Sequence, residues 1–505
     1  MQYRQPRDYP GSRPFRICSV ERVGGGPCLN IYIAVLVGYS GVLILMGLWL
    51  SRRVKHADDF FVAGRSLNAW LIGATILAAN IGAGTTVGAA GIGYARGFSA
   101  WWWVGTAGIG TVIVAAWLGP RFWKLGRDNG YLTVGDFLED RFGPGVRATI
   151  TGLLWLGTPW LLAAQIMAVA FIFDAVAGVP KVISSVVGGV VMITYFTAGG
   201  LVGAAWVNAL QLVVLLGGFM LAVPLALSSV GGIDGLMTSA RTVSTDYTNF
   251  WGASGRNWVF YLALLLPNFM ISPGIVQKAY GARNERSIRI GVSVAGGVLL
   301  LFAFAPALLG MIAHVRFPGL ENAESALPTL LKDGLPAWVG ALGLGAIFMA
   351  EVSSADAILF MLSTSLSKDL YKRFLVPDAN DAQVLRVARL AAIGGGLLSI
   401  SLALISETIV TALGIFYSIV GVVLFVPLLA ALYRDRTRAV EAFAAISFGL
   451  STYLVTRWLV DQPVAGFLTP NLLGLLAAGS AYISTSVLRV RAKGPVPESN
   501  SQANV

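Results

Sequence analysis

The chain has 505 residues, of which 56% are hydrophobic and only 12% are charged, and its mean hydropathy is +0.73. Soluble domains carry about 25% charged residues, so the composition excludes a water-soluble globule and indicates a polytopic protein of the lipid bilayer. The net charge of +11 does not indicate nucleic-acid binding, because basic cytoplasmic loops are usual in membrane proteins and no basic stretch contains a nucleic-acid motif. The two cysteines, Cys18 and Cys28, imply neither a disulfide framework nor a thiol metal site.

The N-terminal tail, residues 1–29, is rich in arginine and proline, and its composition predicts disorder. The first apolar segment follows at about residues 31–50. It is too long for a signal peptide and lacks a small-residue cleavage site, so we expect a retained membrane helix. One transmembrane domain is expected over residues 30–490, with a cytoplasmic C-terminal tail over residues 491–505.

Glycines interrupt the next apolar stretch, residues 72–97, which reads IGATILAANIGAGTTVGAAGIGYARG. The stretch is long enough to cross a bilayer, and Asn80 lies near its middle. So many glycines are useful in a membrane helix only where backbones approach closely or where the helix opens and exposes its carbonyls. Opened helices form ion and substrate sites near the membrane midplane, so this stretch predicts the broken helix of a secondary transporter.

The remaining chain continues as apolar spans of about 20 residues, mostly separated by polar loops. The span at about residues 100–118 opens with three tryptophans, which is typical of an aromatic belt at a membrane interface. Further spans centre near residues 162, 189, 215, 265, 300, 350, 396, 420, 446 and 477. The pattern predicts an all-α polytopic membrane protein with about 13 transmembrane helices.

The distribution of Lys and Arg predicts the orientation of these helices. If the odd-numbered helices run from outside to inside, most basic residues beyond the tail fall in inside loops. The C-terminus is therefore expected in the cytoplasm and the N-terminus outside, with the protein in the inner (plasma) membrane. The tail disagrees with this rule, so either later loops dominate the topology or the first residues come from an overextended translation start. Its arginines are Arg4, Arg7, Arg13, Arg16 and Arg22.

Five signatures then occur in order along the chain: DFFVAGRSLNAW, AANIGAGTTVGAAGIGY, YFTAGGLVGAAWVNALQ, GIVQKAYGARNERSIR and AEVSSADAILFMLSTSLSKDLYKRF. Together they resemble the sodium:solute symporter family over about residues 30–490. The resemblance implies a LeuT-like fold of two inverted five-helix repeats, at about residues 68–230 and 256–433. One extra helix would precede the repeats and two would follow them. Na⁺ would be the coupling ion and a small organic solute the cargo.

A Na⁺ ion at the midplane needs about five or six oxygens, from hydroxyls and from carbonyls that an unwound helix releases. Ser353 and Ser354 offer adjacent hydroxyls in the ninth helix, and Ala350 lies on the same face. The resemblance pairs them with the backbone oxygens of Ala78 and Ile81 in the broken helix. The alternative is structural, because membrane serines often bond a carbonyl of their own helix or allow close packing.

Two acids flank the serine pair, and an ionisable group inside a membrane usually faces a cavity or a partner. Glu351 and Asp356 lie on different faces of the helix, so they cannot both point at one ion. Glu351 is as well explained by a partner on a neighbouring helix as by a direct role. Many family members carry an Asp where this chain has Asn208, so we hypothesise that Asp356 lies opposite Asn208 and binds a second Na⁺ or carries a proton.

By resemblance, the solute pocket lies between the two broken helices, and Pro267 and Pro273 bracket a segment of the second one that is suited to unwinding. Any single aromatic in such a wall is more often a packing residue. Some sugar carriers place an acid at the position of Gly84, so we expect a small amino acid, a monocarboxylate or a similar solute rather than a sugar. The expected wall residues are Asn80, Gly84, Thr85, Trp103, Asn268, Phe269, Phe416 and Tyr417.

The expected function is Na⁺-coupled symport by alternating access, and a H⁺-coupled or mixed-ion symporter of the same fold is the alternative. An enzyme would need a nucleophile or metal cluster near the midplane, where the sequence offers only serines without a nearby histidine or lysine. A sensor would need a signalling domain, and the segment after Leu488 is too short for one. We expect neither a nucleic-acid partner nor an obligatory protein partner.

Overall fold

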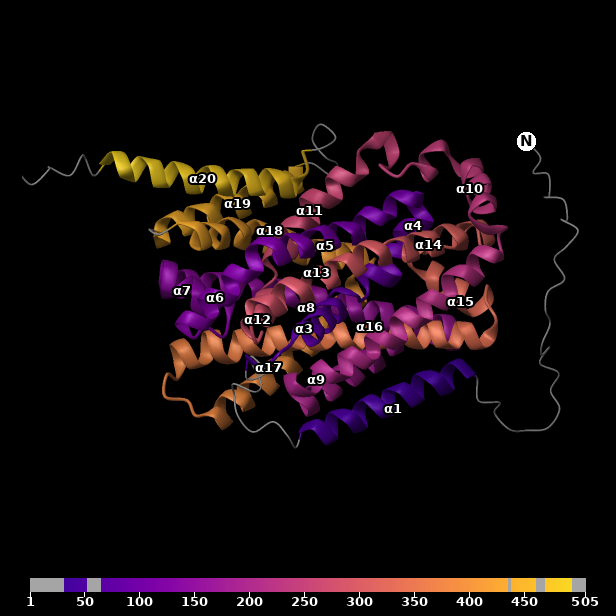
Figure 1. Cartoon of the computed structure of the whole chain (residues 1–505), viewed down its shortest axis with the longest axis horizontal. Coiled ribbons are helices and arrows are strands. Elements are labelled where there is room, and N and C mark those ends of the chain that lie inside the picture. The colour runs from indigo at the N-terminus through magenta and orange to yellow at the C-terminus, as the bar shows by residue number, and fades with distance from the viewer. Residues whose placement is uncertain (1–30, 52–64, 435–436, 460–467, 493–505) are drawn as a thin grey trace, which may run out of the picture. The chain divides into compact units, whose positions relative to one another are not determined.

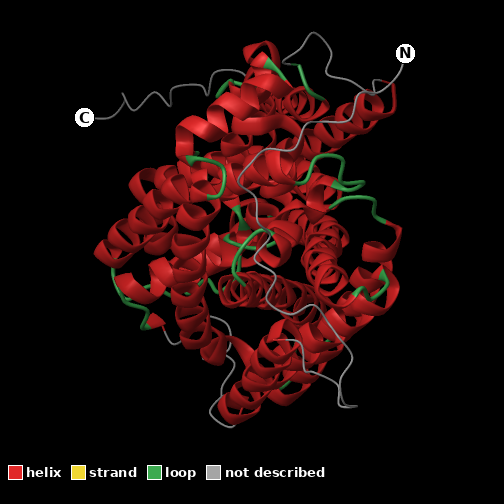
Figure 2. Cartoon of the chain, turned by 90° about the vertical axis from the view of Figure 1, so that its right-hand side faces the viewer, coloured by secondary structure: helices red, strands yellow, loops and turns green. Residues whose placement is uncertain are grey.

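The structure is a computed structural model that describes residues 31–51, 65–434, 437–459 and 468–492 (Figure 1). These residues belong to one compact unit. They form helices and loops, and no strand occurs among them, although Leu67 and Ala282 form an isolated bridge (Figure 2). The predicted disorder of residues 1–29 and most of the predicted tail at 491–505 lie outside the described residues.

The helices follow one another along the whole described chain. The α-helices are α1 (Ile31–Ser51), α3 (Ala69–Asn80), α4 (Ala89–Arg96), α5 (Trp101–Ile113), α6 (Gly119–Asn129), α7 (Val134–Phe142), α8 (Pro144–Ala177), α9 (Lys181–Ser228), α10 (Gly232–Val243), α11 (Asn257–Ile271), α12 (Pro273–Tyr280), α13 (Glu285–Phe302), α14 (Phe304–Arg316), α15 (Ala326–Asp333), α16 (Ala337–Thr364), α17 (Asp381–Ile405), α18 (Ile409–Tyr433), α19 (Ala439–Leu459) and α20 (Pro470–Ala492). The π-helical turns are η2 (Gly84–Gly88), η4 (Val114–Leu118) and η8 (Ser365–Leu375), and the 3-10 turns are η3 (Gly97–Ala100), η5 (Thr245–Thr248), η6 (Ala253–Gly255) and η7 (Ala323–Ser325).

Within the described residues, 10 helical runs are long and apolar enough to cross a membrane. Shorter apolar helices occur at Ile31–Val42, Ala69–Asn80 and Lys181–Thr194. The all-α membrane architecture is therefore confirmed. The predicted number of about 13 spans is not, because spans that the sequence separates run on as one helical stretch, as at Gly84–Asn129.

Helix α9 is the clearest difference from the predicted elements. The sequence predicts two spans, near residues 189 and 215, whereas the structure has one helix of 48 residues. At a rise of about 1.5 Å per residue this amounts to roughly 72 Å if straight, more than twice the thickness of a hydrocarbon core. Asn208 lies in this helix, but its side chain is outside the described residues.

Glycine contacts fix the two halves of the broken helix against different partners. A Cβ atom on Gly73 of α3 would lie 2.9 Å from the carbonyl oxygen of Gly291 in α13. A Cβ atom on Gly93 of α4 would lie 2.7 Å from the carbonyl oxygen of Ala307 in α14. Small residues allow this approach of helix backbones in membranes. The N-terminal half α3 therefore packs on α13, and the C-terminal half α4 packs on α14.

The second interruption lies between α11 and α12 and is narrower than the sequence predicts. Helix α11 continues through Pro267 and ends at Ile271, and Ser272 adopts φ −47° and ψ 124°. Pro273 then begins α12. The first N–H groups of a helix have no partner within the helix, so proline, which lacks an N–H, is well suited to this position. The break is therefore confined to Ser272, next to Pro273, and does not extend back to Pro267.

Candidate functional site

The Gly-rich stretch is broken in its middle, as the sequence predicts. Helix α3 ends at Asn80, Ile81 is extended with φ −98° and ψ 101°, and the chain becomes helical again at Gly84. Side-chain oxygens replace the missing helical acceptors: the Gly82 N–H donates to Thr85 Oγ1 at 2.9 Å and the Ala83 N–H donates to Gln165 Oε1 at 2.8 Å. These bonds satisfy buried donors that a break would otherwise leave unpaired.

Gly82 lets two scaffold helices reach the break. A Cβ atom at this position would lie 2.4 Å from Ser354 Oγ of α16 and 2.6 Å from Gln165 Oε1 of α8. Real Cβ atoms do not approach other atoms this closely, so a side chain at position 82 would force the Ser354 and Gln165 side chains out of their present positions. The requirement for glycine here is steric.

The five oxygens predicted for Na⁺ lie together between α3 and α16. Ser354 Oγ is 3.2 Å from the Ala78 carbonyl oxygen and 3.0 Å from that of Ile81. Ser353 Oγ is 3.4 Å from the Ala78 oxygen and 2.9 Å from the Ala350 oxygen. All five residues are buried. Separations near 3 Å between neighbouring oxygens are those of a group that can surround one small cation.

The two acids of α16, Glu351 and Asp356, are both buried. Glu351 Oε1 accepts a hydrogen bond of 2.8 Å from Thr86 Oγ1, so its partner lies on the neighbouring broken helix. Asp356 is 3% exposed within the same helix. Because the side chain of Asn208 is not described, the predicted pairing of Asp356 with Asn208 stays a hypothesis.

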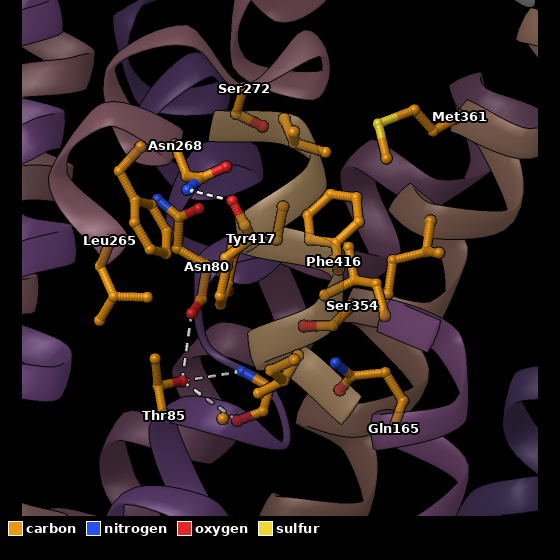
Figure 3. Close-up of a pocket in the computed structure, with 18 of the residues that line it drawn as sticks. Asn80, Thr85, Gln165, Leu265, Asn268, Ser272, Ser354, Met361, Phe416 and Tyr417 are labelled. Carbon is orange, nitrogen blue, oxygen red and sulfur yellow. Dashed lines mark hydrogen bonds between the residues drawn. The ribbon is translucent and has the colours of Figure 1, made fainter. Parts of the chain in front are cut away.

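All eight residues predicted for the solute site line one cavity of about 90 Å³ next to the break (Figure 3). The sequence reasoning missed several lining residues. Gln165 is the most informative of them, because it points from α8 toward the break (Figure 3) and could have been found as the one polar residue in the apolar run LLAAQIMAVA. The other missed residues include Leu161, Leu265, Ser272, Ile358, Met361, Leu413 and Val420.

Polar and aromatic groups around this cavity hold one another in place. Asn268 Nδ2 donates to the carbonyl oxygens of Leu264 at 2.7 Å and Tyr417 at 2.8 Å, which ties α11 to α18. Trp103 Nε1 donates to the Gly84 carbonyl oxygen at 2.8 Å. The Tyr417 ring has its centroid 5.7 Å from that of Phe269. No Lys, Arg, Asp, Glu or His occurs among the described residues that line the cavity.

A second and larger cavity, of about 1120 Å³, lies at one end of the bundle between α4, α11 and the segments around residues 246, 323 and 408. Glu324 is a lining residue that is itself mostly buried. Its Oε2 accepts from the Ile409 N–H at 2.9 Å and its Oε1 from the Val410 N–H at 3.2 Å, so it caps α18. Burial raises the pKa of Glu324 to about 7, although these N–H groups and Lys181 act in the opposite direction.

At the other end, a cluster of ion pairs joins α7, α8 and η8. The buried Arg147 guanidinium lies 3.0 Å from Asp136, 2.7 Å from Glu139 and 2.5 Å from Asp369. Arg373 also pairs with Glu139, and the two guanidinium groups hold the pKa of that carboxyl below its usual value. The cluster closes this end beneath the solute cavity, because Asp369 and Thr133 line a small space of about 40 Å³ that shares Pro273 and Met361 with it.

A membrane bundle with two interrupted helices that meet at a charge-free cavity is the architecture of secondary transporters. The model of the sodium:solute symporter family matches residues 60–449, which is most of the chain, and the chain belongs to this family. It is a Na⁺-coupled symporter of small solutes, a multi-pass membrane protein, and not an enzyme.

The similar proteins are transporters as well. A sodium/glucose cotransporter of Vibrio parahaemolyticus is 27% identical over 72% of this chain and 73% of its own length. The human high affinity choline transporter 1 is 24% identical over 83% of this chain and 75% of its own length. The solved structure of a Na⁺-coupled sialic acid symporter has a TM-score of 0.78 at 22% identity and covers 91% of this chain and 97% of its own. This structural likeness confirms the LeuT-like fold.

Proposed function

We propose that one Na⁺ ion binds between α3 and α16, held by the carbonyl oxygens of Ala78, Ile81 and Ala350 and the hydroxyls of Ser353 and Ser354. The observation that carries this proposal is the approach of the Ser353 and Ser354 hydroxyls to the Ala78 and Ile81 carbonyl oxygens at 3.0–3.4 Å between α16 and α3. The Ala350 oxygen lies 2.9 Å from Ser353 Oγ within α16 itself. In the structure the serine hydroxyls donate to the carbonyls. With Na⁺ present, the hydroxyl protons turn away and all five oxygens face the cation.

The transported solute is proposed to bind in the cavity beside this site. The walls are aromatic on the side of α5, α11 and α18. Asn80 and Asn268 add amide groups on one side of the cavity, and Gln165 adds one on the other side, near Ser354 (Figure 3). A cavity of about 90 Å³ is smaller than the 300–1,000 Å³ typical of drug-sized ligands. A small amino acid, a monocarboxylate or a similar compact solute suits this space better than a sugar.

A second coupling ion is proposed at Asp356, opposite Asn208. The buried carboxyl of Asp356 lies in α16 close in sequence to the Na⁺ ligands, and a buried acid in a membrane helix usually serves an ion or proton. The alternatives of H⁺ coupling and mixed-ion coupling both depend on this residue. An Asp356→Asn variant that keeps the ion-to-solute coupling ratio unchanged would refute the second site.

The orientation is proposed from the basic loops, with the C-terminus in the cytoplasm and the N-terminus outside the plasma membrane. The large cavity beside Glu324 then opens to the exterior, and the Arg147 cluster closes the cytoplasmic end. In this arrangement Na⁺ and solute enter from outside, and transport requires the cluster to open. The repeats are proposed at about residues 68–230 and 256–433, within a transporter domain at 30–490.

Uptake by the purified protein in proteoliposomes tests these proposals. Labelled amino acids, short carboxylates, choline and sugars are offered with an inward Na⁺ gradient, with a H⁺ gradient, or with neither. We expect uptake that requires the Na⁺ gradient, and we expect Ser354→Ala to reduce it at least tenfold because one ligand and two backbone contacts are lost. The matched control is Ser363→Ala, in which a buried hydroxyl of the same helix bonds only its own backbone. Uptake driven equally by H⁺ alone would overturn the Na⁺ assignment.

A further inference from the structure

The carboxyl group of Glu351 is completely buried in the middle of a membrane-spanning helix. It is not one of the five oxygens proposed above to bind Na⁺. Helix α16 around it is buried as well, from Val339 to Ala355 with few exceptions. Placing a carboxyl group in such surroundings is costly unless a specific partner compensates it. The contact with Thr86 therefore needs a functional explanation.

The contact lies on the opposite side of the break from the proposed Na⁺ ligands. Thr86 belongs to η2, the first turn after the break, and its Oγ1 lies 2.8 Å from Glu351 Oε1. The same hydroxyl lies 3.0 Å from the carbonyl oxygen of Gly82, inside the break. Glu351 is thus linked through one side chain to both the unwound segment and the outer half of the helix.

Helix α16 consequently holds the broken helix at two points that differ in chemistry. The inner point consists of the Ser353 and Ser354 hydroxyls against the Ala78 and Ile81 carbonyls. Those oxygens are the proposed Na⁺ ligands, so their mutual contacts change when the ion binds or leaves. The outer point joins two side chains, Glu351 and Thr86, and uses none of those five oxygens.

We propose that Glu351 is a positioning residue for Na⁺ binding, which anchors η2 and α4 to α16 through Thr86 while α3 is free to move. The anchor holds the unwound segment at the place where the Ile81 carbonyl faces Ser354. Release of Na⁺ then loosens only α3, because α3 is held to α16 by the oxygens that bind the ion, whereas η2 and α4 are held by the contact between Glu351 and Thr86. This proposal depends on the Na⁺ site proposed above and assigns the pivot of the movement to the outer side of the break.

Sodium titration of the purified protein in detergent tests the anchor without knowledge of the solute. The apparent melting temperature is followed by tryptophan fluorescence as NaCl replaces KCl at constant ionic strength. We expect Thr86→Val and Glu351→Ala each to raise the half-saturating Na⁺ concentration about tenfold, the change expected for a lost hydrogen bond to a charged or acidic group. The double variant should show a smaller increase than the product of the two single changes, since both remove the shared contact. Each single change also removes a contact of its own, that of Thr86 with the Gly82 carbonyl or that of Glu351 with the Ala83 N–H.

Conservative variants separate positioning from direct coordination and from general folding. Thr86→Ser keeps the hydroxyl and Glu351→Gln keeps an acceptor oxygen, so both should stay within about twofold of the unmodified protein. Thr485→Val, which alters a threonine of α20 whose hydroxyl bonds only carbonyls of its own helix, should leave the Na⁺ response unchanged. If Glu351→Ala fails to fold, the comparison of Thr86→Val with Thr86→Ser tests the proposal by itself.

The opposing outcomes are distinct. An unchanged Na⁺ response in Thr86→Val would overturn the anchor while leaving the Na⁺ site intact. A loss in Glu351→Gln as large as in Glu351→Ala would also overturn it, because the charge itself would then act on the ion. A protein that responds equally to Na⁺ and K⁺ would overturn the Na⁺ site and the anchor together.

Discussion

The two ends of the helix bundle are closed by different kinds of interaction. At one end, the Arg147 guanidinium is buried against three carboxylates from α7 and η8. At the other end, a cavity of about 1120 Å³ remains, and Glu324 reaches across its wall to two backbone N–H groups of α18. Charges buried in pairs are costly to separate, whereas a side chain bonded to backbone N–H groups can exchange them for water. In the proposed transport cycle, opening the Arg147 end should therefore be the more demanding step.

The largest effect is expected from breaking the Arg147 cluster. Arg147→Ala leaves Asp136, Glu139 and Asp369 close together without their shared cation, and loss of one partner of a buried pair costs about 3–5 kcal/mol. The apparent melting temperature should fall strongly. Arg289→Ala is the control, because its pair with Glu285 is exposed and should contribute less than about 1 kcal/mol. Equal effects of the two substitutions would contradict the difference between the ends.

A smaller effect at the same end is expected from Thr133. Its side chain caps α7 by accepting from the Asp136 N–H at 3.1 Å, and its hydroxyl lies 2.8 Å from Asp369 Oδ1. Thr133→Ala should cost about 0.5–2 kcal/mol, the range for a lost N-cap, and Thr133→Ser should cost little. Amide hydrogen exchange should accelerate in α7 and stay unchanged in α4. Faster exchange in both helices would show that the two ends are not independent.

The smallest effect is expected from pH at the other end. The pKa of Glu324 is raised to about 7, above the value of 4.5 for a free side chain, because burial disfavours its charged form. The stability that this proton binding contributes is fully present below about pH 4.5 and is lost as the pH rises through about 7. The melting temperature should therefore decline from pH 5 to pH 8 more steeply in the unmodified protein than in Glu324→Gln. Identical slopes of melting temperature against pH in the two proteins would show that Glu324 is not the group that titrates.

Much of the fold and of the candidate site could be predicted from local sequence features. The glycines around Asn80 predicted the break, and the order of the signatures placed Ser353 and Ser354 opposite it. The eight solute-site residues line one cavity because they flank the two interrupted helices, whose positions glycine and proline reveal. Whether Na⁺ and solute bind there stays a prediction that the experiments above test.

Other features depend on contacts between distant segments and could not be predicted. The Arg147 cluster joins residues up to 233 positions apart, from Asp136 to Asp369, and each of them reads alone as an ordinary loop or helix-end charge. Gln165 meets the Ala83 N–H only after α8 packs across the break. The continuous helix α9 was missed because polar residues between two apolar runs usually mark a loop.

The absence of a side chain at Gly82 limits how ion preference can be changed in this protein. A side chain at position 82 would collide with the Ser354 hydroxyl and the Gln165 amide, so a new ligand there would displace an oxygen that is already present. The carbonyls of Ala78 and Ile81 are main-chain groups, which substitution cannot replace. At the proposed Na⁺ site, selectivity between Na⁺, Li⁺ and H⁺ should therefore be adjustable mainly from α16, because the Ser353 and Ser354 hydroxyls are the only side-chain oxygens among the five proposed ligands.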